Sequence, residues 1–162
     1  MANWKKIGII SGIGAGVVGL ITYVSRLNRA QAQLETVTIA KIHSLKLDGL
    51  TIRVDVQLKN PSRSSFNIKF PFVKIVYKDK VIGTSQVIDK NITIPAYGEA
   101  NIESIMIKIP VTSMFSIGAG LIKLLVQKEE VIISVKTIST IDLGWKKLPY
   151  EKSDYMTLHP TA

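Results

Sequence analysis

The chain of 162 residues lacks cysteine altogether. Disulfide bonds, metal sites built on thiolates and acylation at a lipoprotein-type cysteine are therefore excluded. Histidine is scarce too, because His43 and His159 are the only two. With so few nitrogen donors at so wide a spacing, we expect no metal site and no cofactor.

The residue groupings that would carry catalysis are also missing. Glu129 and Glu130 are adjacent and would point apart, so they do not form the carboxylate pair that acid and base catalysis uses. No serine stands in a nucleophile-elbow sequence. Gly118 and Gly120 lack the lysine that a phosphate-binding loop requires. We therefore expect a protein that is not an enzyme.

Acidic residues are in the minority, since 21 Lys and Arg stand against 12 Asp and Glu, a formal net charge of +9. No arginine-rich run or basic and aromatic motif accompanies the excess, so sequence-specific recognition of nucleic acid is not expected. A diffuse positive charge suits an anionic lipid surface. Alternatively, lysines on the outer faces of strands protect sheet edges from pairing.

Residues 7–24 contain no charged residue, and this run decides whether the protein is attached to a membrane. As a helix it would be roughly 27 Å long, which is just enough to cross a bilayer core. Its apolar content favours insertion, and aromatic and basic residues flank it. We predict a single-pass membrane anchor whose lipid contacts are Trp4, Ile7, Ile10, Ile13, Val17, Leu20 and Tyr23, with headgroup contacts at Lys5, Lys6, Arg26 and Arg29.

Three glycines in the run, Gly8, Gly12 and Gly16, recur every four residues and would share one helix face. Small residues at this spacing let a second helix approach closely, so the face predicts helix–helix contact and self-association. The alternative is that glycine is simply common in membrane helices.

Two other interpretations of the N-terminus compete with the anchor. A secretory signal would also combine lysines, an apolar core and a small-x-small cleavage site, for which Ala30-Gln31-Ala32 would serve. Arg26 and Arg29 lie between that core and that site, which argues against cleavage. A glycine-rich apolar N-terminus could instead be a buried or fusion-like peptide.

From residue 36 onward the hydrophobic pattern changes to a period of two, which predicts β-strands. Val37 and Ile39 alternate with polar neighbours, and residues 50–59 form the clearest strand, ended by Asn60-Pro61. The inward row that starts at Phe66 changes phase beside Pro71, which predicts a bulge or a bend between sheets.

Residues 113–127 change to a period near 3.6 and predict one late helix that covers an open end of the sheets. Residues 147–150 add at most one edge strand within an otherwise ill-defined tail. We therefore expect an anchor and stalk at 1–35, one domain at 36–143 and a tail at 144–162. The domain is expected to be a mainly β, antiparallel β-sandwich.

Three segments, VDVQLKNPS (54–62), KIVYKDKVIGTS (74–85) and ITIPAYGEANIESIMIKIP (92–110), follow one another in order and spacing. Together they resemble the group-two late-embryogenesis-abundant domain, also called the water-stress and hypersensitive-response domain. The resemblance implies an immunoglobulin-like or fibronectin-like sandwich with one helix, no catalytic site, and roles in stress protection or at membranes. Several plant relatives also carry an N-terminal membrane helix before the domain.

These observations predict a membrane-anchored β-sandwich that works by binding or scaffolding at a lipid bilayer, with other protein subunits or further copies of itself as partners. A second hypothesis is a minor capsid or membrane-linking protein of a virus particle with an internal membrane. A third is a secreted stress-protection protein.

Overall fold

The computed structural model describes residues 34–116, 120–144 and 146–159. The predicted anchor, its glycine face and its headgroup contacts all fall within residues 1–33 and lie outside the described residues. Within the described ranges, no helix is long and apolar enough to cross a membrane.

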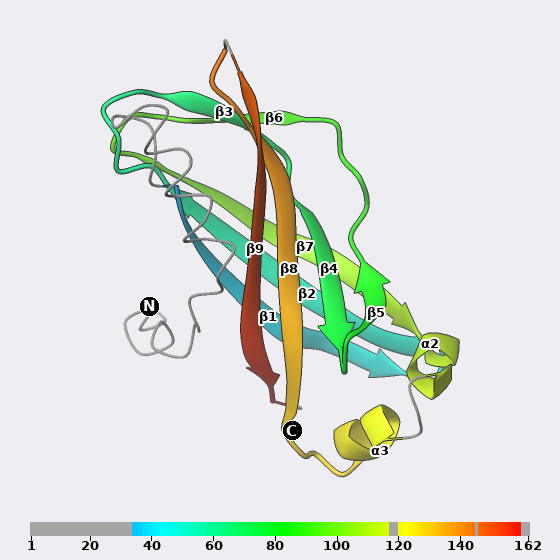
Figure 1. Cartoon of the computed structure of the whole chain (residues 1–162). Helices are drawn as coiled ribbons and strands as arrows, with labels where there is room; N and C mark the ends of the chain where they lie inside the picture. Colours follow the sequence, from blue (N-terminus) through cyan, green and yellow to red (C-terminus); the bar gives the residue numbers. More distant parts are fainter. Residues whose placement is uncertain (1–33, 117–119, 145, 160–162) are drawn as a thin grey trace.

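The described chain is mainly β and forms two antiparallel sheets (Figure 1). The three-stranded sheet has the order β1-β2-β7, and the six-stranded sheet contains β3, β4, β5, β6, β8 and β9. The strand bounds are β1 Glu35–Lys46, β2 Gly49–Lys59, β3 Phe66–Lys69, β4 Phe72–Tyr77, β5 Lys80–Thr84, β6 Asn91–Ile94, β7 Glu99–Pro110, β8 Val131–Asp142 and β9 Lys147–Leu158. The helices are α2 Val111–Ser116 and α3 Gly120–Val126.

Strand β8 organises the six-stranded sheet. Strand β9 pairs with it along its whole length, from Val131 to Asp142. Strands β4 and β3 pair with successive parts of β8, and because a strand has only two edges, they share the edge that β9 leaves free. The expected change of phase beside Pro71 therefore marks the step from β3 to β4 within one sheet, and not a crossing between sheets.

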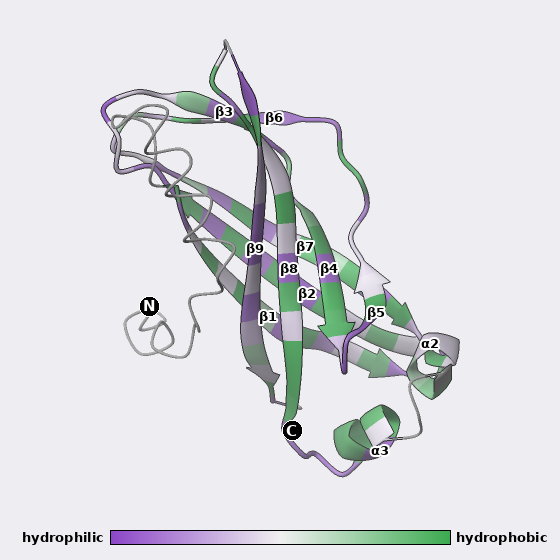
Figure 2. Cartoon of the chain, viewed as in Figure 1, coloured by the Kyte–Doolittle hydropathy of each residue, from purple (hydrophilic) through white to green (hydrophobic). Residues whose placement is uncertain are grey.

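The inner faces of the two sheets share one hydrophobic core. Strand β2 follows its predicted alternation, with one face buried and the other half-buried, and the stripes of Figure 2 show this alternation along the strands. The buried residues of β2 are Leu50, Ile52, Val54, Val56 and Leu58. Each such side chain contributes about 1.5–3 kcal/mol by leaving water, which explains why this strand gives the clearest pattern in the sequence.

The alternation predicted for β1 is correct, but the prediction that Val37 and Ile39 face the core is wrong. Thr36 and Thr38 are buried, whereas Val37 and Ile39 are half-buried on the outer side. Register explains this, because Thr36 pairs with Leu58 and must point to the same side as that core residue. The threonines are accepted inside because the segment of β9 that faces them is polar.

The predicted single helix is also wrong, since the segment contains the two short helices α2 and α3. Helix α2 packs against β2 and β7 and buries Met114, and α3 packs against β8 and buries Leu121 and Leu125. Two short helices can follow both sheets around the end of the core, where a straight helix would follow only one. The expected covering role is confirmed, because both helices lie at one end of the sheets (Figure 1).

The C-terminal segment is ordered strand and not a tail with a short edge strand. Strand β9 has 12 residues and pairs with β8 throughout. The N-terminal boundary also shifts, because Leu34, expected in a polar stalk, is buried in the core, and Glu35 already belongs to β1. The sheet therefore begins immediately at the first described residues.

Candidate functional site

The predicted contact residues all lie within residues 1–33, outside the part of the chain that the structure describes. Three polar arrangements elsewhere are the candidates for a functional site. They are an inner polar cluster between β1 and β9, a charged network on the outer face of β2 and β7, and two interlocked loops at one end of the domain.

The inner polar cluster consists of Thr36, Thr38, Thr137, Tyr150, Lys152 and Asp154. Lys152 Nζ lies 3.1 Å from Asp154 Oδ1, and their side chains are only 16% and 6% exposed. The same ammonium group donates a hydrogen bond to the carbonyl oxygen of Thr36, whose hydroxyl group shares a hydrogen bond with the hydroxyl group of Tyr150. These contacts hold the edge strand β1 against the edge strand β9.

Hydrogen bonding within the cluster is incomplete. The ammonium group of Lys152 is close enough for an ion pair but is not aligned for a hydrogen bond, so neither oxygen of Asp154 accepts one from the described residues. The hydroxyl groups of Thr38 and Thr137 are also buried, and neither has a hydrogen-bond partner among the described residues. Charges that point inward at a sheet edge are a known defence against pairing with other chains. The cluster is best explained as such a structural device.

Tyr150 makes the cluster sensitive to alkaline pH. Burial, opposed by the hydrogen bond with Thr36 and assisted by the charge of Asp154, raises the pKa of Tyr150 from 10.0 to about 12. The folded state therefore holds the phenol proton more tightly than the unfolded state does. Its contribution to stability is complete below pH 10 and is lost as the pH rises from 10 to 12.

We expect Tyr150→Phe to remove this part of the pH dependence. A pKa difference of about two units corresponds to about 2–3 kcal/mol, so the free energy of unfolding of the wild type should fall more than that of the variant across this range. Urea unfolding of both proteins at pH 9 and pH 12 measures the difference. Parallel decreases for the two proteins would contradict the assignment to Tyr150.

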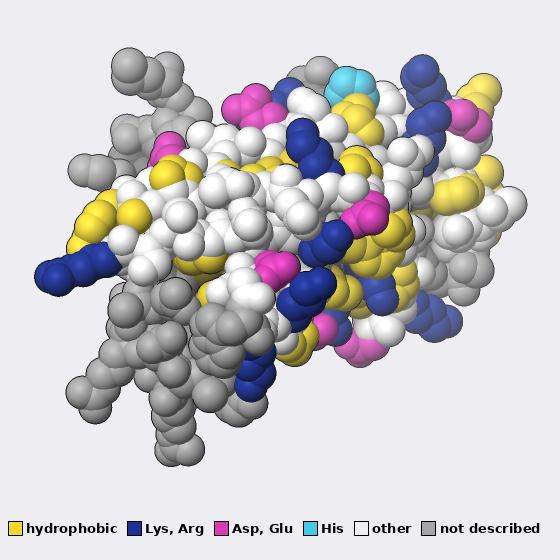
Figure 3. Space-filling view, turned by 90° about the horizontal axis from the view of Figure 1, so that it is seen from above, with side chains coloured by type: hydrophobic (Ala, Val, Ile, Leu, Met, Phe, Trp, Pro, Cys, Tyr) yellow, Lys and Arg dark blue, Asp and Glu magenta, His cyan; other side chains and the backbone are white. Residues whose placement is uncertain are grey.

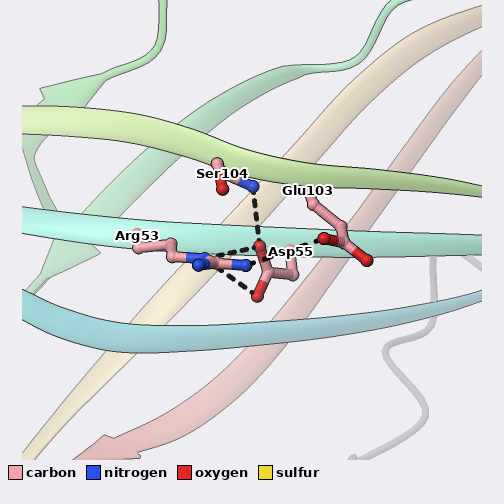
Figure 4. A network of polar contacts seen from close by, with 4 residues as sticks. All are labelled: Arg53, Asp55, Glu103 and Ser104. Atoms are coloured by element: carbon pink, nitrogen blue, oxygen red, sulfur yellow. Dashed lines mark hydrogen bonds and ion pairs between the residues drawn. The ribbon is translucent and has the colours of Figure 1, made fainter.

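The second candidate is a charged network on the outer face of the three-stranded sheet (Figure 4). Asp55 on β2 lies opposite a β-bulge in β7, where the pairing moves from Ile102 to Ile105 and leaves Glu103 and Ser104 facing one residue. The backbone N–H of Ser104, which has a φ of 61°, donates a hydrogen bond of 2.7 Å to Asp55 Oδ1. The carboxylate therefore caps the bulge.

Arg53 completes this network. Its Nε donates to both oxygens of Asp55, at 2.9 and 3.2 Å, and this hydrogen bonding, with the charge of the carboxylate, raises the pKa of Arg53 above its ordinary value. The bulge matters because Ile102 and Ile105 are three residues apart and would otherwise face opposite sides of the sheet. Both are buried. The network therefore serves the core, and its charges already satisfy one another.

We expect Asp55→Ala to destabilise the protein by about 1–2 kcal/mol, because it removes a charge-assisted cap from a strained backbone position. Glu103 is the matched control, since its carboxylate lies 3.9 Å from Arg53 Nη2 and its side chain is 71% exposed. Glu103→Ala should change the free energy of unfolding by less than about 0.5 kcal/mol. Urea denaturation compares the two, and equal effects would show that Asp55 does not cap the bulge.

The third candidate, which we call the N-terminal tip, comprises residues 61–65 and 95–98. The buried side chain of Asn60 joins the two loops, because its Nδ2 donates to the carbonyl oxygens of Ser64 and Pro95, both at 2.9 Å. Its Oδ1 accepts the N–H of Ser62 at 2.9 Å, which is the turn bond expected after a strand that ends in Asn-Pro. Asn60 therefore acts structurally, as the sequence predicted, and holds the tip in one conformation.

No group of three His, Asp or Glu side chains within residues 34–116, 120–144 and 146–159 could hold a metal ion. His43 is exposed on β1, and His159 Nδ1 lies 3.1 Å from Glu130 Oε1 on the surface.

Sequence reasoning missed the inner polar cluster because it assigned residues 144–162 to a tail. One signal could have found it. The even positions of β9 include Leu148, Met156 and Leu158, all pointing into the core or packed against it, and this parity also places Tyr150, Lys152 and Asp154 inside.

Comparison with known proteins supports the fold. No known family profile matches the chain, and no curated protein matches it in sequence. A protein from Archaeoglobus fulgidus, known from its crystal structure, is similar with a TM-score of 0.54 at 10% identity, covering 80% of this chain and 99% of that one. A protein from Arabidopsis thaliana, solved in solution, is similar with a TM-score of 0.55 at 18% identity, covering 78% of this chain and 80% of that one.

At these identities the likeness concerns the fold alone, and fold does not determine function. The chain therefore shares its β-rich architecture with proteins from an archaeon and a plant. The similarity to the plant protein is compatible with a domain of the late-embryogenesis-abundant kind.

Proposed function

We propose that this chain is an immunoglobulin-like or fibronectin-like β-sandwich of the group-two late-embryogenesis-abundant kind, which an N-terminal helix tethers to a lipid bilayer. In this proposal the domain acts by binding or scaffolding and not by catalysis. The glycine face at Gly8, Gly12 and Gly16 would then support self-association within the bilayer.

The observation that carries the proposal is that the folded domain begins directly at Leu34, so that the segment between it and the uncharged run is short. Leu34 is buried in the core and β1 begins at Glu35. Only residues 25–33 separate this attachment from the uncharged run at 7–24. Nine residues span at most about 30 Å when fully extended, so an inserted helix would keep the domain close to the membrane surface.

Carbonate extraction of membranes from cells that express the full chain tests the tether. We expect the wild-type protein to remain in the membrane pellet. The double variant Ile13→Asp, Val17→Lys should move to the supernatant, because each charge costs about 2.5–3.5 kcal/mol at the centre of an inserted helix. Asn28→Lys, a charge outside the uncharged run, is the matched control and should stay in the pellet.

Two outcomes would overturn the proposal. Wild-type protein in the supernatant at full length would remove the membrane tether. A mature protein that begins at Gln33 would show that the apolar segment is a cleaved signal and would favour secretion.

A further inference from the structure

The N-terminal tip lies where the chain enters the domain. Glu35, at the start of β1, lines the same surface hollow as Pro61 and Tyr97 from the two loops. Figure 1 shows both loops at the end of the sheets opposite to α2 and α3. If residues 7–24 cross a bilayer, this end of the domain is the end nearest to it.

The tip is a rigid structure. Two backbone hydrogen bonds add to those of the Asn60 side chain. The backbone N–H of Asn60 donates to the carbonyl oxygen of Gly98 at 2.8 Å, and the N–H of Tyr97 donates to the carbonyl oxygen of Ser62 at 3.0 Å. The two loops are therefore bonded to each other at several points. The backbone that carries their exposed side chains is therefore held in one conformation, which lowers the entropy cost of binding a partner.

Tyr97 is the most exposed aromatic residue of the described chain, at 67%. Its φ is 52°, in the left-handed region that costs a residue with a Cβ roughly 1–2 kcal/mol. Its ring contributes little to the core, so the fold alone does not explain a large apolar side chain in this position. Exposed tyrosines are characteristic of the zone where a membrane meets water.

Arg63 is the charged residue of the two loops, and Glu35, Lys59 and Glu99 line the hollow beside them. The Nε atom of Arg63 donates to the hydroxyl oxygen of Tyr97 at 3.1 Å, and the guanidinium group forms no ion pair with Asp or Glu among the described residues. Residues 61–65 and 95–98 contain no acidic residue, and Arg63 is their only charged residue. The corresponding left-hand end of Figure 3 shows hydrophobic side chains beside a projecting basic side chain.

We propose that the N-terminal tip is a lipid headgroup contact, in which Tyr97 lies in the interfacial zone and the guanidinium of Arg63 binds lipid phosphate. An arginine can present two parallel N–H donors to the oxygens of a phosphate group. The contact seats the domain end-on against the bilayer. This inference rests on the proposed function, because the tether is what brings the tip to the membrane.

The absence of cysteine allows a direct test by single-site spin labelling of the full chain in nanodiscs that contain anionic phospholipid. Ala96→Cys places a label in the tip and leaves Tyr97 and Arg63 intact. Leu47→Cys is the control, because Leu47 is fully exposed in the β1–β2 turn at the opposite end. We expect the label at position 96 to be accessible to oxygen dissolved in lipid, and the label at 47 to be accessible only to a nickel complex in water.

Arg63→Gln provides the second measurement. Loss of one basic residue near an anionic surface lowers the equilibrium constant for contact between the tip and the bilayer by roughly fivefold. The label at 96 should therefore become markedly more accessible to the nickel complex. Arg53→Gln, on the outer face of β2, is the matched control and should leave the label unchanged.

The outcomes separate this inference from the proposed function. Protein that enters nanodiscs while its labels at 96 and 47 are equally exposed to water would overturn the tip contact and leave the tether standing. Protein that does not enter nanodiscs at all would overturn both.

Discussion

Replacing Lys152 by methionine is expected to destabilise the protein by about 3–5 kcal/mol, which is the usual cost of removing one partner from a buried ion pair. Methionine keeps most of the length of lysine but removes the ammonium group. The side chain of Asp154 is only 6% exposed, so its carboxylate stays buried. It then has no ion-pair partner among the described residues. The bond to the carbonyl oxygen of Thr36 is lost as well.

Two controls distinguish a buried charge from a general effect of the substitution. Lys136→Met removes a surface partner of Glu151, 2.6 Å away, where the two side chains are 34% and 55% exposed, and should cost less than about 1 kcal/mol. The double variant Lys152→Met, Asp154→Leu should recover most of the lost stability, because a buried ion pair can often be replaced by apolar residues. Urea unfolding of the full chain in mild detergent measures all three. A loss below about 1 kcal/mol for Lys152→Met would show that water reaches Asp154 and that the cluster is not buried in solution.

Gly49→Ala is expected to cost about 3 kcal/mol or more, from a strained backbone together with a steric clash. Gly49 has a φ of 151°, and a Cβ at this position would lie 2.2 Å from the carbonyl oxygen of Ile109. That oxygen belongs to the backbone of β7, which is paired with β2, so it cannot move without disturbing the sheet. The tight approach allows the β1–β2 turn to sit against the end of β7.

Gly144→Ala is the matched control for this prediction. Gly144 also has a positive φ, 83°, but a Cβ there would meet no atom within 4 Å. Its substitution should therefore cost only the backbone term, roughly 1–2 kcal/mol. Thermal unfolding followed by circular dichroism compares the two variants, and an equal decrease in melting temperature would rule out the clash as the cause.

Much of the fold could be predicted because local patterns and tertiary structure agree at many positions. The alternation of β2 and the strand end at Asn60-Pro61 are both confirmed. In the hairpin between β4 and β5, Lys78 and Asp79 both have the positive φ that a two-residue turn requires. Each of these features depends on a few neighbouring residues.

The errors occurred where a residue is stabilised by a partner that is distant in sequence. Thr36 is buried because Tyr150 and Lys152, more than 100 residues away, bind it. The charges of β9 made the strand resemble a solvated tail, since neither Lys152 nor Asp154 is apolar. The predicted contact residues within 1–33 stay predictions. The N-terminal tip forms only because the loops at 61–65 and 95–98, distant in sequence, lie side by side in the fold.

The sequence by itself determined the β-rich class, the core face of β2, the strand end at Asn60-Pro61 and the absence of any cysteine chemistry, because hydrophobic periodicity and turn residues act over short distances. Only the tertiary structure decided that Thr36 and Asp154 lie inside, that the C-terminal segment completes the larger sheet, and that Arg63 meets Tyr97. Each of these depends on which strands become neighbours, and that is set by the packing of the whole core and not by any single segment.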